Sequence, residues 1–243
     1  MAETSGYVVS SAAVEPEVRQ GDTAEERLTI GRPSGSTRLE QRVIRFAPGR
    51  SQPRGGDGTC DVLYVVSGRG ALLAGSERHE LEPELGVYVD GGQGYEVDNP
   101  GPDALTVIAV TAPATGSGDR SKRRVASVRF GDQPELRADH KRTYRYLVNE
   151  QVGCEELTQF VGIVEPCRAP DHSHAYDEVG YVLEGTGIAH LGDVRTPIEA
   201  GSCFHLPPGK VHCIENSGPG VMRIMGVFHP SGSPASRSYE DNK

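Results

Sequence analysis

The chain has 243 residues, of which 36% are apolar and 24% are charged, and its formal net charge at pH 7 is −9. This acidic balance argues against nucleic acids and anionic membranes as partners, because both bind basic surfaces. Membrane insertion is also excluded, since uncharged apolar runs such as residues 62–66 fall far short of the about 20 residues that a spanning helix needs.

Short runs rich in Val, Ile, Tyr and Phe recur along the chain and predict β-strands, because Gly, Pro, Asp and Asn separate them. In the first half these runs cover residues 42–46, 62–66, 71–74, 87–89 and 105–110. Helical periodicity is scarce, and the best candidate for a helical turn lies near residues 23–28. The sequence therefore predicts an all-β fold built from barrels or jelly rolls.

An internal repeat divides the chain into two copies of one unit. At an offset of 117, residues 63–70 align with residues 180–187, and Asn99 aligns with Asn216. Upstream of these segments, an offset of 118 restores the match. A repeat of this length indicates two similar domains in tandem.

The boundary between the copies follows from composition. Residues 114–124 are rich in Gly, Ser, Thr and charged residues and predict a linker. We therefore expect an N-terminal barrel over 1–113, a C-terminal barrel over 125–232 and a flexible tail over 233–243.

The cysteines favour a reducing compartment. There are five, an odd number, and none forms a Cys-x-x-Cys pair. The N-terminus has no basic stretch followed by an apolar one, so the sequence predicts no secretion signal. We expect free thiols and a cytoplasmic location.

The second copy contains a cluster of metal-ligand residue types. His172, His174 and Glu178 are separated by even numbers of residues, so along an extended strand they share one face. A Pro- and Gly-containing turn precedes His212, and a barrel can bring the strand that it starts beside the first one. Three imidazoles and one carboxylate suit Fe, Mn, Ni, Co or Zn.

The spacing of these residues resembles the two sequence motifs of the cupin superfamily. The first motif is His172-x-His174-x-x-x-Glu178, followed after six residues by Gly185. The second motif is Gly201, followed after five residues by Pro207-x-Gly209-x-x-His212-x-x-x-Asn216. The resemblance covers almost the whole chain and implies a bicupin, with two tandem jelly-roll (double-stranded β-helix) barrels.

The resemblance also implies one divalent metal ion in the C-terminal barrel, held by His172, His174, Glu178 and His212. Fe(II) is the first expectation, with Mn, Ni, Co and Zn as alternatives. Four protein ligands leave one or two positions for water, substrate or dioxygen. A closed, structural zinc site is a further alternative.

The first copy departs from the motif. The repeat places Gly55, Asp57, Asp61 and Tyr95 where the second copy has its four ligands, so no imidazole remains. We expect no transition metal there and a structural role for this barrel. The alternative is that its cavity binds an effector or the tail of the substrate.

Three residues are candidates for catalysis. Glu178 is a ligand that could also act as a base, Tyr176 could line the mouth of the barrel, and His190 could serve as an acid or base. His205 is a similar candidate, and strand register decides whether His190 and His205 face the interior.

The sequence predicts a mononuclear metal enzyme that acts on a small molecule, and dioxygenation is the first expectation for its reaction. An isomerase, decarboxylase or hydrolase that uses the metal as a Lewis acid is the alternative. A non-catalytic barrel that binds a small molecule is the third interpretation. Because cupin barrels pair, the resemblance leaves a homodimer open as well.

Overall fold

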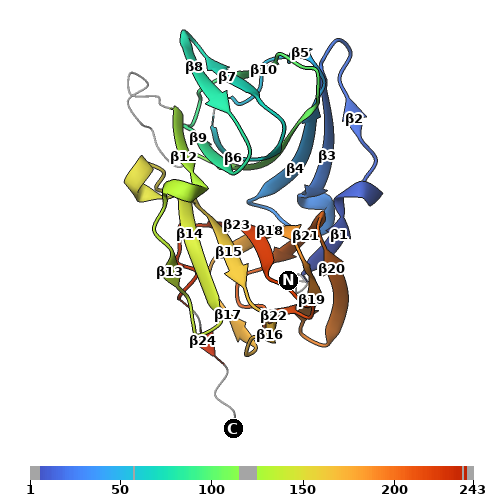
Figure 1. Ribbon diagram of the computed structural model, residues 1–243, viewed down its shortest axis with the longest axis vertical. Helices are drawn as coiled ribbons and strands as arrows, with labels where there is room; N and C mark the ends of the chain where they lie inside the picture. The colour runs from blue at the N-terminus through green and yellow to red at the C-terminus, as the bar shows by residue number, and fades with distance from the viewer. Residues whose placement is uncertain (1–5, 57, 115–124, 237, 240–243) are drawn as a thin grey trace.

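The computed structural model describes residues 6–56, 58–114, 125–236 and 238–239, which form two β-barrels placed one above the other (Figure 1). Each barrel consists of a larger and a smaller antiparallel sheet. The all-β fold with two tandem jelly-roll barrels is therefore confirmed.

The N-terminal barrel combines sheets of seven and four strands. The larger sheet has the order β12 (Val125–Arg129), β9 (Leu85–Val89), β6 (Thr59–Ser67), β11 (Leu105–Pro113), β4 (Glu40–Phe46), β3 (Ala24–Ile30) and β2 (Glu17–Val18). The smaller sheet has the order β5 (Gly49–Arg50), β10 (Glu96–Asn99), β7 (Gly70–Ala74) and β8 (Glu77–Leu81).

The C-terminal barrel repeats this plan. Its larger sheet has the order β1 (Tyr7–Ser10), β21 (Ser202–Leu206), β18 (Asp177–Glu184), β23 (Met222–His229), β15 (Thr158–Val164), β14 (Arg142–Val148) and β13 (Leu136–Arg137). Its smaller sheet has the order β20 (Val194–Glu199), β19 (Thr186–Leu191), β22 (His212–Asn216), β17 (His172–Ser173) and β24 (Ser238–Tyr239), with β16 (Cys167–Arg168) also paired to β22.

Helical structure is limited to short 3₁₀ turns in the described residues. They are η1 (Ser11–Ala13), η2 (Arg32–Ser34), η4 (Phe130–Asp132) and η5 (Glu150–Val152). The expected helical turn near residues 23–28 is wrong, because this segment pairs with β4 as strand β3. None of the described helices has the length and apolar character to cross a membrane.

Two edge strands cross between the barrels and depart from the expected domain boundaries. β1 comes first in the chain but pairs with β21 of the C-terminal barrel. β12 follows the expected linker but pairs with β9 of the N-terminal barrel. Each exchange covers a sheet edge that would otherwise expose unpaired backbone groups. Residues 115–124 of the expected linker lie outside the described residues.

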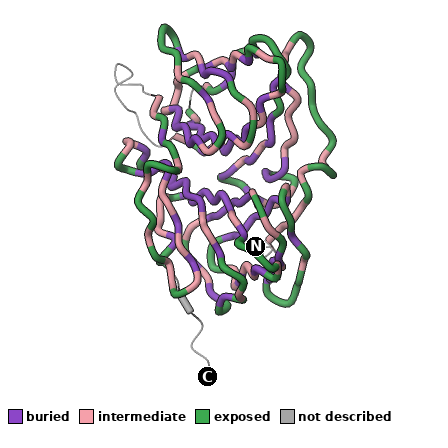
Figure 2. The backbone as a smooth tube through the Cα atoms, in the orientation of Figure 1, coloured by how far each residue is buried: buried purple, intermediate pink, exposed green. Residues whose placement is uncertain are grey.

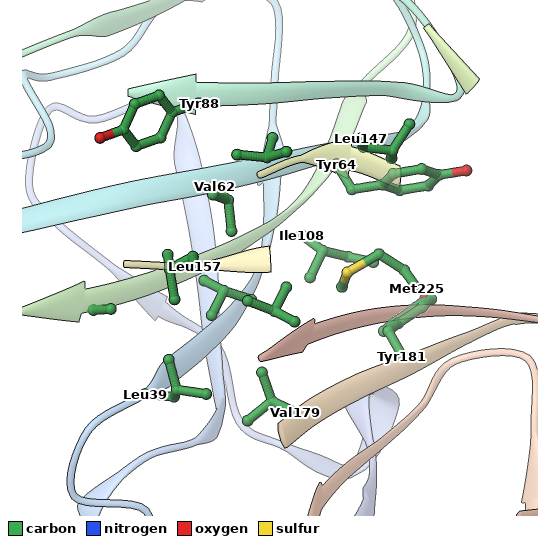
Figure 3. Close-up of a cluster of buried hydrophobic side chains, with 14 of the residues drawn as sticks. Leu39, Val62, Tyr64, Tyr88, Ile108, Leu147, Leu157, Val179, Tyr181 and Met225 are labelled. Atoms are coloured by element: carbon green, nitrogen blue, oxygen red, sulfur yellow. The ribbon is translucent and has the colours of Figure 1, made fainter. Parts of the chain in front are cut away.

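A shared apolar core joins the two larger sheets (Figure 3). The residues of β6 alternate between two cores: Val62 and Tyr64 belong to the shared core, whereas Leu63 and Val65 fill the N-terminal barrel. β6 is therefore apolar on both faces, and its sequence is an uninterrupted run of apolar residues over 62–66. Figure 2 shows buried backbone concentrated where the barrels meet and inside each barrel.

Two equivalent glutamines bridge the barrels. The side-chain amide of Gln41 donates to the backbone oxygen of Gly180 at 3.3 Å, and that of Gln159 donates to the backbone oxygen of Leu63 at 3.2 Å. The two donors, Gln41 and Gln159, are related by the repeat offset of 118, and the two acceptors, Leu63 and Gly180, by the offset of 117. The barrels therefore contact each other through the same surface, as the subunits of a two-fold dimer do.

Candidate metal centre

Strand pairing in the C-terminal barrel brings the two sequence motifs together. His172 in β17 lies directly opposite His212 in β22. Glu178 in β18 lies opposite Phe228 in β23 and Leu206 in β21. Both motifs therefore meet inside one barrel, although they are separate in the sequence.

Three of the four predicted ligands converge, and the fourth, His172, lies beside them. The ligand atoms of His174, Glu178 and His212 all lie within 4.8 Å of one another. The ring centroid of His212 is 4.6 Å from that of His172 and 4.6 Å from that of His174. All four residues are buried, with exposed fractions between 3% and 9%.

Backbone carbonyls orient the three imidazoles. Nδ1 of His172, His174 and His212 lies 3.0, 2.8 and 2.7 Å from the carbonyl oxygen of a residue two positions away. When Nδ1–H donates to a carbonyl, the lone pair of the ring is on Nε2. The arrangement therefore suits metal binding through Nε2.

Glu178 completes the donor set. Its Oε2 lies 2.8 Å from Nε2 of His174. Burial by itself raises the pKa of Glu178, but the hydrogen bond that it shares with His174 and the electrostatic attraction of the three histidines outweigh burial and lower it. The 2.8 Å separation is close to the about 3 Å expected between adjacent ligand atoms that each lie about 2.1 Å from one ion. These residues fit a divalent transition metal.

A cavity of about 100 Å³ adjoins the four residues inside the barrel. Tyr144, Phe160 and Phe228, called the aromatic wall below, form one side of it. Arg142 also lines it, with its Nε donating to Asp139 at 2.7 Å. An adjoining cavity argues for a site that admits a small molecule rather than a closed structural zinc.

Tyr176 lies against the site through its ring. The ring stacks on His174 with a centroid distance of 4.2 Å. Its hydroxyl lies 2.9 Å from the backbone oxygens of Ser233 and of Ser236. Tyr176 also lines the cavity, and its hydroxyl is engaged with the backbone; a role in catalysis stays a prediction.

His190 and His205 do not line the cavity. His190 bonds to Glu215 at 2.7 Å, on the opposite face of β19 from Ala189 and Leu191, which fill the barrel. His205 bonds to Asp177 at 2.6 Å. The structure therefore corrects the expectation that His190 acts in catalysis, because strand alternation turns its side chain outward.

Sequence reasoning missed the segment that follows β23. Part of the expected flexible tail is ordered: β24 pairs with β17 beside His172, and residues 233–236 lie against Tyr176. The remainder of that tail lies outside the described residues. The aromatic wall and Arg142 were also missed, because they come from β14, β15 and β23, which carry no motif.

Comparisons with known proteins agree with this geometry. The cupin domain family matches residues 161–228. A 60-residue segment is 32% identical to the uncharacterized protein MJ1618 of Methanocaldococcus jannaschii, and it covers 24% of this chain and 48% of that protein. The match thus spans about half the length of that relative.

Solved structures share the fold over nearly the whole chain. A Pseudomonas aeruginosa protein described as glyoxylate-induced has a TM-score of 0.79 at 18% identity, covering 98% of this chain and 91% of that one. A variant of Bacillus subtilis oxalate decarboxylase has a TM-score of 0.72 at 12% identity, covering 96% and 79%. Residues 161–228 thus match the cupin domain family, and the chain as a whole shares a two-barrel fold with these solved structures.

Proposed function

We propose that the protein is a metal-dependent enzyme whose C-terminal barrel holds one divalent ion through His172, His174, Glu178 and His212. The observation that carries the proposal is the convergence of His174, Glu178 and His212 beside a cavity, with the ring of His172 packed 4.6 Å from that of His212. When bound, the metal would supply Lewis acidity and, in the case of iron, redox chemistry toward dioxygen.

The cavity supports dioxygenation of a small molecule as the reaction. Among the described residues that line it, the carboxylate and imidazoles are the proposed ligands themselves. Arg142 is paired with Asp139, and the Tyr176 hydroxyl is engaged with the backbone. Among the described residues, the hydroxyls of Thr143 and Tyr144 are the remaining groups of the lining that could transfer a proton, so a reaction that needs little proton transfer suits it best.

The residues of the site have different proposed roles. His172, His174 and His212 hold the ion, and the aromatic wall binds an apolar or aromatic body and excludes water. Glu178 either stays a ligand or accepts a proton at Oε2 from the substrate. The substrate itself is proposed to be a small metabolite with an oxygen, nitrogen or sulfur donor.

The test is elemental analysis of protein purified without added metal or nickel affinity, followed by dioxygen uptake with catechols, aromatic carboxylates and thiols. One equivalent of iron and substrate-dependent uptake would support the proposal. Turnover without dioxygen would replace it with Lewis-acid chemistry. A lack of stoichiometric metal, even after reconstitution, would overturn the site.

A matched pair of variants checks the assignment to one barrel. His212→Ala removes an imidazole ligand, so we expect metal content to fall well below one equivalent. Tyr95→Phe changes the equivalent position of the N-terminal barrel, so we expect unchanged metal content. Loss of metal from Tyr95→Phe would contradict the assignment.

A further inference from the structure

A second cavity, of about 220 Å³, lies inside the N-terminal barrel. Strand register places it where the other barrel has its candidate metal centre. Asp61 lies opposite Thr111, as Glu178 lies opposite Phe228, and the offset of 117 relates the two pairs. The cavity is therefore the N-terminal counterpart of the candidate site.

The chemistry of this cavity differs from that of its counterpart. At the positions equivalent to the aromatic wall, the N-terminal barrel has Glu26, Arg42 and Thr111, and all three line the cavity. Tyr95 replaces a histidine, and its backbone pairs with that of Arg54. A ligand here would meet charged and hydroxyl groups.

The acidic side chains already have donors. The Thr111 hydroxyl donates to Asp61 at 2.6 Å, and the Tyr95 hydroxyl is a second hydrogen-bond partner of Asp61. Glu26 accepts from Arg54 at 2.6 Å. The acceptors of the cavity are thus largely satisfied within the barrel.

The arginines of the cavity are partly paired: Arg42 donates to Glu40 at 2.8 Å, and the terminal nitrogens of Arg54 donate to Asp22, Glu26 and the backbone oxygen of Gln52. Donors nevertheless remain. Arg54 is nine-tenths buried, with a side-chain exposure of 6%, and its Nε has no hydrogen-bond partner among the described residues. Nε of Arg42 lies 3.5 Å from Glu26, beyond a short hydrogen bond. Arg19 lines the cavity and forms no ion pair within the described part of the chain. A buried N–H without an acceptor is costly, so the cavity favours a ligand rich in acceptors.

We propose that the N-terminal barrel binds a small carboxylate in this cavity without a metal ion. A carboxylate accepts charge-assisted hydrogen bonds from guanidinium N–H groups, and Arg42 and Arg54, whose Nε–H has no partner among the described residues, both line the space. The neighbouring Asp22, Glu26 and Asp61 make a singly charged anion a better fit than a phosphate dianion, because they repel additional negative charge. The proposal is independent of the function proposed for the other barrel.

The test uses the full chain after removal of metal by a chelator. Acetate, glycolate and propionate are titrated at constant ionic strength, with sodium chloride and phosphate as controls, and binding is followed by calorimetry and by the arginine Nε–H signals in ¹H–¹⁵N spectra. We expect saturable binding of a carboxylate that shifts the Arg54 Nε–H signal, identified by its loss in Arg54→Lys.

Two variants make the result decisive. Arg42→Gln, at a half-buried position, should weaken carboxylate binding at least about tenfold while the protein stays folded. His212→Ala should leave binding unchanged, because it alters only the other barrel. The proposal is overturned by equal binding to Arg42→Gln, by loss of binding in His212→Ala, or by a lack of saturable binding.

Discussion

Each histidine of the candidate metal centre turns Nδ1 toward a backbone carbonyl, whereas His190 and His205 bond to carboxylates elsewhere. The hydrogen-bond partners of the proposed ligands thus differ from those of His190 and His205. His229 is a further case: its Nδ1 is buried without a partner in the described residues.

His229 predicts a pH dependence of stability. Burial lowers its pKa below the ordinary 6.5, and the charge of Arg38 adds to this effect. The unfolded chain therefore binds a proton that the folded chain does not, so the free energy of unfolding should fall as pH drops through 6.5 and level off below the folded pKa. In urea denaturation, the free energy of unfolding of His229→Gln should fall less between about pH 7 and 5 than that of the wild type. An equal pH dependence in the two proteins would contradict this explanation.

Among the strands, glycines allow backbone and rings to pack closely. A Cβ on Gly226 of β23 would lie 2.6 Å from Cε1 of Phe160 in the aromatic wall. Gly226→Ala should therefore lower the free energy of unfolding by about 1–3 kcal/mol in urea denaturation. Gly220→Ala is the control, because its Cβ would meet nothing within 4 Å, and an equal loss there would refute the packing argument.

The segment after β23 depends on Tyr176. Tyr176→Phe removes the hydroxyl that bonds to the backbone of Ser233 and Ser236, so amide hydrogen exchange across residues 231–236 should accelerate. Ser236→Ala should leave exchange unchanged, because the acceptor is a backbone oxygen. Equal exchange in the wild type and Tyr176→Phe would show that other contacts hold the segment.

Across both barrels, the shared core and the two glutamine bridges couple the halves of the chain. Gln41→Leu and Gln159→Leu should each lower the free energy of unfolding by about 1 kcal/mol or more, because each removes the buried hydrogen bond between the barrels, and Gln41→Leu also removes the bond to the Thr29 hydroxyl at 3.2 Å. Denaturant unfolding should show one cooperative transition for both barrels. Two separate transitions would contradict this coupling.

Local sequence patterns were enough to predict the all-β class, the repeat and the four residues that converge in the C-terminal barrel. Strand periodicity, turn residues and motif spacing are properties of short segments, so they can be read without coordinates. Only the folded chain shows that His190 points away from the barrel interior. The same holds for the exchange of β1 and β12 and for the contacts that residues 233–236 make. These features depend on strand register and on contacts between segments far apart in the sequence, which local patterns do not encode.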